Sequence, residues 1–266
     1  MLGAIAGDII GSAYEFHPWR GEWQDLPLFP QAASFTDDTV MTIAVARAIM
    51  DWEKGRDFGE ILIDNFHAYG HAYPKAGYGG KFYVWLRKKK REPYNSFGNG
   101  SAMRVSPAGW AFDTLEETEA MAAASAAVTH NHPEGVKGAQ AVAGSIFLAR
   151  TGASKEDIRQ YVMDRYGYDL NRSLAEIKPC HTFNETCQGS VPEAIQAFLE
   201  SGSYEEAVRK AVWLAGDADT QAAIAGSIAE AMYGVPEPIR DAALQRLDER
   251  LYEDWQAWQQ WLAERK

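Results

Sequence analysis

Two segments far apart in the sequence carry aspartates and a threonine directly before a run of apolar or small residues. Residues 35–39 read FTDDT, and residues 216–220 read GDADT. Either segment alone fits an ordinary helix start, because Asp and Thr are favoured N-cap residues and acids there suit the helix dipole. Together they offer four carboxylates, and so much negative charge around two helix starts requires cations between them. Ligands that are all hard oxygen favour Mg²⁺ or Mn²⁺ over zinc or copper.

The composition is that of a globular chain with an acidic surface. The 266 residues are 46% hydrophobic and 24% charged, so the chain can bury a core, and the net charge is −11. Such a surface repels nucleic acid and anionic membranes at long range. An anionic ligand therefore needs local positive potential from metal ions, backbone N–H groups or helix N-termini.

Cysteine content and hydropathy point to a cytoplasmic protein. Cys180 and Cys187 are the only cysteines, too few for a disulfide framework or a zinc cluster, and this fits a reducing compartment. The apolar start of the chain has no basic region and is interrupted by Asp8, so it is a poor signal peptide. The sequence has no run of eighteen apolar residues, so we expect no membrane span.

Helix signals recur along the chain, whereas the alternating patterns typical of strands are scarce. We therefore expect an all-α fold with ten or more helices. Capping boxes predict helix starts at 114–117 (TLEE), 154–157 (SKED), 190–193 (SVPE) and 203–206 (SYEE), and Gly216 is expected to close the last of these helices.

Small residues dominate two further helical segments, 135–149 and 220–234. Such residues let helix backbones approach closely, so we expect these helices at the centre of the molecule. Leucines and tryptophans at helical spacing over 244–262 predict a helix that packs on the domain, with dimerisation through the tryptophans as the alternative.

The remaining segments predict surface features. Residues 17–34 contain three prolines and predict a loop across the surface. The basic run 87–91 predicts a solvated helix face, with docking of an acidic partner as the alternative. The chain has no repeat, low-complexity tract or linker, so we expect one domain over residues 1–266.

Beyond these patterns, the sequence resembles the ADP-ribosylglycohydrolase family, which includes the dinitrogenase reductase-activating glycohydrolases. The resemblance covers nearly the whole chain, with five motifs in the family's order. It implies a compact, all-α, orthogonal multi-helix bundle with a dinuclear magnesium or manganese centre. The motifs are a first helix GAIAGDIIGSAYE (3–15), the metal motifs FTDDT (35–39) and GDADT (216–220), a glycine-rich ligand loop GNGSAMR (98–104) and a histidine loop THNHPEG (129–135).

The resemblance implies that the two metal motifs hold two Mg²⁺ or Mn²⁺ ions. Ions that share carboxylates can orient a water molecule or the hydroxyl groups of a substrate. Asp37, Asp38 and Asp219 are expected to be needed for catalysis, and Thr39 has a capping or supporting role. The ligands carried over by position are Thr36, Asp37, Asp38, Asp217, Asp219 and Thr220.

Glu15 matches a glutamate that, in some family members, closes over the metal site and contacts the reacting ribose. We expect it to act as a gate or as a general acid or base. The alternative is an exposed acid at the end of a helix, because the following residues, FHPWRGEW, do not align with the family.

The glycine-rich loop fits an anionic ligand. Gly98 and Gly100 let the backbone approach a phosphate, and N–H groups at the following helix start can bind an anion. The resemblance places His130 near the bound nucleotide, and a positively charged histidine closing a helix is the alternative. The H-x-H spacing of His130 and His132 is not interpreted as a metal site, because oxygen ligands are already supplied. The expected substrate-binding residues are Asn99, Gly100, Ser101, Met103 and His130.

These implications describe a metal-dependent hydrolase that cleaves the glycosidic bond between ADP-ribose and a modified protein side chain or another acceptor. An ADP-ribose-binding relative without activity, and a dinuclear hydrolase of another nucleotide or glycoside, are the alternatives. The expected partners are ADP-ribose and ADP-ribosylated proteins or small molecules. Nucleic acid is not expected as a partner, although an ADP-ribosylated nucleic acid stays open as a substrate. The protein is expected to be a monomer. The sequence does not identify the linkage, for which residues 17–34 and 71–85 are expected to set the selectivity.

Overall fold

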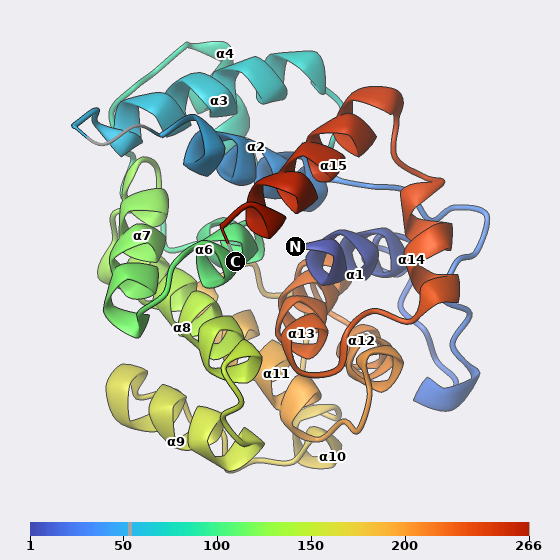
Figure 1. The fold of residues 1–266 in the computed structure, drawn as a ribbon. Coiled ribbons are helices and arrows are strands. Elements are labelled where there is room, and N and C mark those ends of the chain that lie inside the picture. Colours follow the sequence, from blue (N-terminus) through green and yellow to red (C-terminus); the bar gives the residue numbers. More distant parts are fainter. Residues whose placement is uncertain (53–54, 266) are drawn as a thin grey trace.

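The computed structural model describes residues 1–52 and 55–265, and the regular secondary structure in this part of the chain is all helical (Figure 1). It contains no β-strand, and one isolated antiparallel bridge joins Gly98 and Thr186. The expected all-α fold is therefore confirmed. The helices are α1 (Leu2–Ser12), the 3₁₀ helix η1 (Trp23–Asp25), α2 (Asp37–Asp51), α3 (Phe58–Ala72), α4 (Gly80–Arg87), α5 (Gly100–Met103), α6 (Ser106–Ala111), α7 (Leu115–Ala127), α8 (Pro133–Arg150), α9 (Lys155–Tyr166), α10 (Leu174–Ile177), α11 (Cys187–Leu199), α12 (Tyr204–Trp213), α13 (Ala218–Tyr233), α14 (Glu237–Leu244) and α15 (Glu249–Ala263).

The small-residue helices α8 and α13 lie inside the molecule, as predicted. Helix α13 is buried from Ala218 through Ala229 and packs against α1, α11, α12 and α8. Helix α8 packs in turn against α6, α7, α9 and α11. Helix α1 is also buried, from Leu2 through Gly11, and α2 and α11 are largely buried. Helix α15 crosses α2, and α14 lies beside α1 (Figure 1).

Three of the four predicted helix starts are confirmed at the capping residue itself. The hydroxyl groups of Thr114, Ser154 and Ser203 accept hydrogen bonds from the N–H groups of Glu117, Asp157 and Glu206. The prediction at Ser190 is wrong, because α11 already begins at Cys187 and Ser190 donates instead to the carbonyl of Thr186, one turn back.

Two predictions about helix ends need correction. Helix α12 ends at Trp213, and Ala215, with φ +65°, turns the chain before Gly216, with φ +80°. The C-terminal segment forms two helices rather than one, because α14 ends at Leu244 and α15 begins only at Glu249. Leu251 and Trp258 of the second helix are completely buried, as expected for a helix that packs on the domain.

The surface segments follow the prediction in part. Residues 17–34 are irregular apart from η1. In the basic run, α4 ends at Arg87, so Lys88–Arg91 are exposed but do not form a helix face. Within the described ranges, no helix combines the length and the hydropathy needed to cross a lipid bilayer.

Candidate metal centre and ligand cavity

A cavity of about 430 Å³ opens where the helix starts of α2 and α13 meet the segments around residues 76–82 and 94–100. Its lining contains both metal motifs and most of the expected ligand loop. Ser101 is the one predicted site residue that does not line the cavity. The predicted residues that do line it are Glu15, Thr36, Asp37, Asp38, Asn99, Gly100, Met103, His130, Asp217, Asp219 and Thr220.

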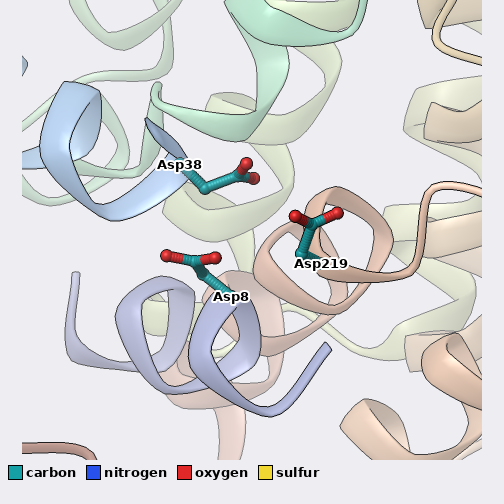
Figure 2. Close-up of side chains that lie close together, drawn as sticks. All are labelled: Asp8, Asp38 and Asp219. Carbon is teal, nitrogen blue, oxygen red and sulfur yellow. The ribbon is translucent and has the colours of Figure 1, made fainter. Parts of the chain in front are cut away.

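Carboxylates from three helices converge beside this cavity, which Asp38 and Asp219 line. Asp8 of α1, Asp38 of α2 and Asp219 of α13 each place an oxygen atom within 4.8 Å of the others (Figure 2). Glu15, Asp217 and Asp219 form a second group by the same measure. The two groups share Asp219, and an acidic cluster of this kind could hold a metal ion.

The approach of α1 to α13 depends on glycines at every fourth position of α1. A Cβ atom on Gly3, Gly7 or Gly11 would lie only 2.2–2.5 Å from the backbone oxygen atoms of Gly226, Ala222 and Ala218. Real Cβ atoms do not approach backbone oxygen so closely, so glycine is required for this packing. The contact brings Asp8 beside Asp219, because these residues follow Gly7 and Ala218 directly.

Asp8 is the site residue that the sequence analysis missed. Its carboxylate accepts hydrogen bonds from the N–H and hydroxyl groups of both Thr36 (2.9 and 2.7 Å) and Thr39 (3.1 Å for the N–H). Three of these four donors bind Oδ2 and one binds Oδ1, so the carboxylate is held firmly against both threonines. Asp8 therefore fixes the start of α2, and the available signal was a lone acid within a fully apolar helix.

Asp38 and Asp219 are far less satisfied by the protein. The Oδ1 atom of Asp38 is buried and has no hydrogen-bond partner among the described residues. Its Oδ2 atom accepts from the Thr220 hydroxyl at 3.3 Å, and Asp219 accepts from the Thr220 N–H at 2.9 Å. A buried carboxylate oxygen without a donor is costly, and a divalent cation is the partner that its chemistry fits.

Asp37 also lines the cavity, but it is a member of neither of the two clusters of acidic residues. Its N–H donates to the carbonyl of Ala76, and a Cβ atom on Gly77 would lie 3.3 Å from its Oδ1 atom. Asp37 therefore borders the loop before α4. Its predicted role as a metal ligand stays a prediction.

Burial and mutual repulsion raise the pKa values of these acids. Desolvation is the main cause, and it raises the pKa of Asp8 to about 6 and that of Glu15 to about 7. Desolvation followed by repulsion from Asp8 raises the pKa of Asp37 to about 8. Burial and the neighbouring carboxylates also hold the pKa values of Asp38 and Asp219 well above the usual range. Without cations, the cluster therefore retains protons at neutral pH.

The ligand loop contributes to the same site in an unexpected way. The Asn99 amide donates to Asp217 at 2.7 Å and to the Ser190 hydroxyl at 3.1 Å, so the side chain orients a predicted metal ligand. The hydroxyl group of Ser101 is buried and donates to the carbonyl of Gly135 at 2.7 Å. The predicted substrate contacts of these two residues are not tested by the structure.

Arg104 and His130 line the same cavity and are almost fully buried. Burial, and then the charge of Arg104, lower the pKa of His130 well below its usual value, so the imidazole is neutral. This is inconsistent with the alternative in which a charged histidine closes α7. His132 does not form a metal site with it, because His132 caps α8 by accepting from the N–H of Glu134.

Comparisons with known proteins found relatives that match most of this chain. The chain is 27% identical to ADP-ribosylhydrolase ARH3 of Mus musculus, over 89% of this chain and 83% of that protein. It is 26% identical to ADP-ribosylarginine hydrolase Tri1 of Pseudomonas putida, over 95% of this chain and 76% of that protein. It is also 26% identical to the ADP-ribosyl-[dinitrogen reductase] glycohydrolase of Rhodospirillum rubrum, over 93% of this chain and 88% of that protein.

A solved structure described as an ADP-ribosylglycohydrolase-related protein complex has the same fold. It superposes with a TM-score of 0.69 at 24% sequence identity and covers 95% of this chain and 94% of its own. The family model for ADP-ribosylglycohydrolase matches residues 1–266. Because that match spans the whole sequence, the chain belongs to the ADP-ribosylglycohydrolase family.

Proposed function

We propose that this protein is an ADP-ribosyl glycohydrolase, which hydrolyses the glycosidic bond between ADP-ribose and a modified side chain or another acceptor. The observation that supports this most strongly is that two clusters of three acidic residues lie at one cavity and have Asp219 in common. Relatives of the chain carry names that specify hydrolysis of ADP-ribosyl bonds, and they match it over most of their length.

We propose Mg²⁺ or Mn²⁺ as the cofactor, with two ions held by Thr36, Asp37, Asp38, Asp217, Asp219 and Thr220. The all-oxygen donor set and the unpartnered Oδ1 atom of Asp38 fit such ions. When bound, the ions supply positive charge that neutralises the carboxylates and orients substrate hydroxyl groups. Two hydrogen bonds hold proposed ligands in place: the Thr36 hydroxyl group donates to Asp8, and the Asn99 amide donates to Asp217.

Glu15 is the residue that we propose for proton transfer. Its half-buried carboxyl group has a pKa raised to about 7, so both of its protonation states are populated at neutral pH. A carboxyl group in this condition can take a proton from an attacking water molecule or give one to the leaving group. Hydrolysis of a glycoside through an oxocarbenium-like state needs such a group beside the anomeric carbon.

Selectivity for the acceptor belongs, in this proposal, to the rim of the cavity. Six residues between Ala76 and Phe82 line the cavity, whereas residues 17–34 do not contribute to its lining. Phe97 and Phe183 also line it, although each is exposed by more than a third. These segments would contact the group from which ADP-ribose is removed.

The deciding experiment is a hydrolysis screen over defined ADP-ribosyl linkages, including arginine, serine and O-acetyl adducts, with added Mg²⁺ or Mn²⁺. We expect turnover of at least one linkage, loss of activity in EDTA, and loss of at least about a hundredfold in Asp37→Ala and Asp219→Ala. Glu253→Ala is the matched control, because Glu253 is an exposed acid of α15 that does not line the cavity.

Three outcomes would contradict this proposal. Turnover at the wild-type rate in both aspartate variants with the metal chelated would contradict the site. Mg²⁺-dependent binding of ADP-ribose without turnover of any linkage would identify a binding protein instead. Turnover of another substrate that ADP-ribose does not inhibit would indicate a hydrolase of a different nucleotide or glycoside.

A further inference from the structure

Arg104 is a buried cation that no carboxylate neutralises among the described residues. Its side chain is 1% exposed and follows directly after α5. The guanidinium group lies 4.4 Å from the centre of the Phe66 ring, so a cation–π contact stabilises the charge. The Nη2 atom donates to the Thr129 hydroxyl at 2.8 Å. Burying a guanidinium group without a carboxylate partner costs free energy, and this cost points to a role for the charge at the cavity.

The hydroxyl group of Thr129 connects Arg104 to His130. Its Oγ1 atom lies 2.8 Å from the Nδ1 atom of His130. A guanidinium group can only donate, so Thr129 accepts from Arg104, and its single proton stays available for a hydrogen bond to Nδ1. A neutral imidazole that accepts at Nδ1 must carry its proton on Nε2. The same Arg104 charge and burial lower the pKa of His130, which keeps the ring neutral.

The Nε2 atom of His130 faces the glycine loop of the cavity. A Cβ atom on Gly100 would lie 3.2 Å from Nε2, and one on Gly98 would lie 3.6 Å away. No group among the described residues forms a hydrogen bond with Nε2, whereas the neighbouring Tyr94 contacts the ring at a centroid distance of 5.9 Å. The glycines therefore leave a donor of known direction free for a ligand.

We propose that Arg104 and Thr129 are positioning residues that fix His130 as an Nε2–H donor toward an acceptor oxygen of the ligand beside Gly98 and Gly100. This inference rests on the proposed function for the identity of the ligand. It assigns roles to two residues that do not themselves need to touch the substrate, and it specifies the tautomer of a third.

The test compares Thr129→Val, which removes the hydroxyl group at nearly constant volume, with Thr129→Ser, which keeps it. The first measurement is the ¹⁵N spectrum of the imidazole rings in the metal-free protein, with the signal of His130 among the six histidines identified by its absence in His130→Gln. We expect a neutral Nε2–H ring from pH 5.5 to 8 in wild type and Thr129→Ser. In Thr129→Val we expect a mixture of tautomers or a ring that is protonated near pH 6.

The second measurement is ADP-ribose binding by calorimetry in the presence of Mg²⁺. We expect the Kd to rise about tenfold in Thr129→Val and to change less than about twofold in Thr129→Ser, because one directed hydrogen bond is weakened. A Gly100→Ala variant should also bind ADP-ribose more weakly, since its Cβ atom would cover Nε2, yet it should keep the wild-type ring signal.

The inference is overturned if the ring of wild-type His130 carries its proton on Nδ1, or if Thr129→Val leaves both the ring signal and the Kd unchanged. A failure of the proposed function would look different. In that case the ¹⁵N signals would follow the expected pattern, but neither wild type nor Thr129→Ser would bind ADP-ribose.

Discussion

At the scale of single residues, Asp8 positions the start of α2 through the hydrogen bonds that it accepts from Thr36 and Thr39. In Asp8→Asn, the amide group would turn at least one N–H toward the four donors of Thr36 and Thr39, and each unsatisfied pair costs about 1–3 kcal/mol. The start of α2 would shift, and Asp38 would shift with it. We expect Mg²⁺ affinity, measured by calorimetry, to fall at least about tenfold.

A matched control separates this effect from a simple loss of charge. Asp241→Asn removes the same charge from an exposed position on α14 and should leave the Mg²⁺ affinity within about twofold. Equal Mg²⁺ affinity in Asp8→Asn and wild type would show that Asp8 is only a buried residue of α1 with no influence on the site.

The residues that the sequence could identify were those with an excess of charge. FTDDT and GDADT carry more carboxylates than helix capping needs, and the structure places both motifs at one cavity. Asp8 could not be recognised in this way, because a single acid in an apolar helix has no local partner. Its partners Thr36 and Thr39 are adjacent to it only in the folded chain.

At the scale of elements, the packing of α1 against α13 determines the distance between Asp8 and Asp219. In Gly7→Ala, the new Cβ atom would meet the backbone of Ala222 at 2.2 Å, so the helices must separate. Overpacking of this kind costs about 1–3 kcal/mol. We expect thermal unfolding to begin lower, with Tm reduced by about 5 °C, and a smaller rise in Tm on addition of Mg²⁺.

Gly202→Ala is the corresponding control, because Gly202 is exposed and its Cβ atom would meet only the flexible end of Glu206, at 3.4 Å. Its Tm should stay within about 1 °C of wild type. If Gly7→Ala were as stable as Gly202→Ala and responded equally to Mg²⁺, the close contact of α1 and α13 would not be what positions the carboxylates.

The elements also show where sequence patterns were informative and where they were not. Capping boxes located α7, α9 and α12, because the cap is a local interaction between residues three apart. The same pattern at Ser190 was misleading, since the side chain bonds back into a helix that had already begun. The sequence analysis drew no prediction from the glycine spacing of α1, because the helix that it packs against, α13, lies more than 200 residues away.

At the scale of the whole molecule, a chain with net charge −11 gathers the buried Asp38, Asp217 and Asp219 at one cavity. The density of helix signals was enough to predict the all-α class. The crossing of α15 over α2 could not be predicted, because the amphipathic spacing of a helix does not show which helix it packs against. The expectation of a single domain stays a prediction. Burial of these acids, and then their mutual repulsion, make the stability of the metal-free protein depend on pH.

The final prediction concerns stability as a function of pH. The pKa values of Glu15 and Asp37 are raised to about 7 and about 8, and burial and repulsion also hold those of Asp38 and Asp219 well above the usual range. In the unfolded chain these carboxyl groups titrate near pH 4. Between pH 4 and 8 the folded state therefore binds more protons than the unfolded state, and the free energy of unfolding decreases as pH rises.

Bound Mg²⁺ would replace these protons, so the gain in Tm on adding Mg²⁺ should grow as pH rises from 6 to 8.5, by about 5 °C or more. The lowered pKa values of His130 and His181 act in the opposite sense, but they affect the proteins with and without Mg²⁺ alike. In Asp38→Asn, one of the carboxyl groups with a raised pKa is replaced by a neutral amide, so in EDTA we expect Tm to fall less than in wild type between pH 6 and 8.5, and we expect little gain from Mg²⁺. A gain that is independent of pH in wild type would mean that cations do not bind at these carboxylates.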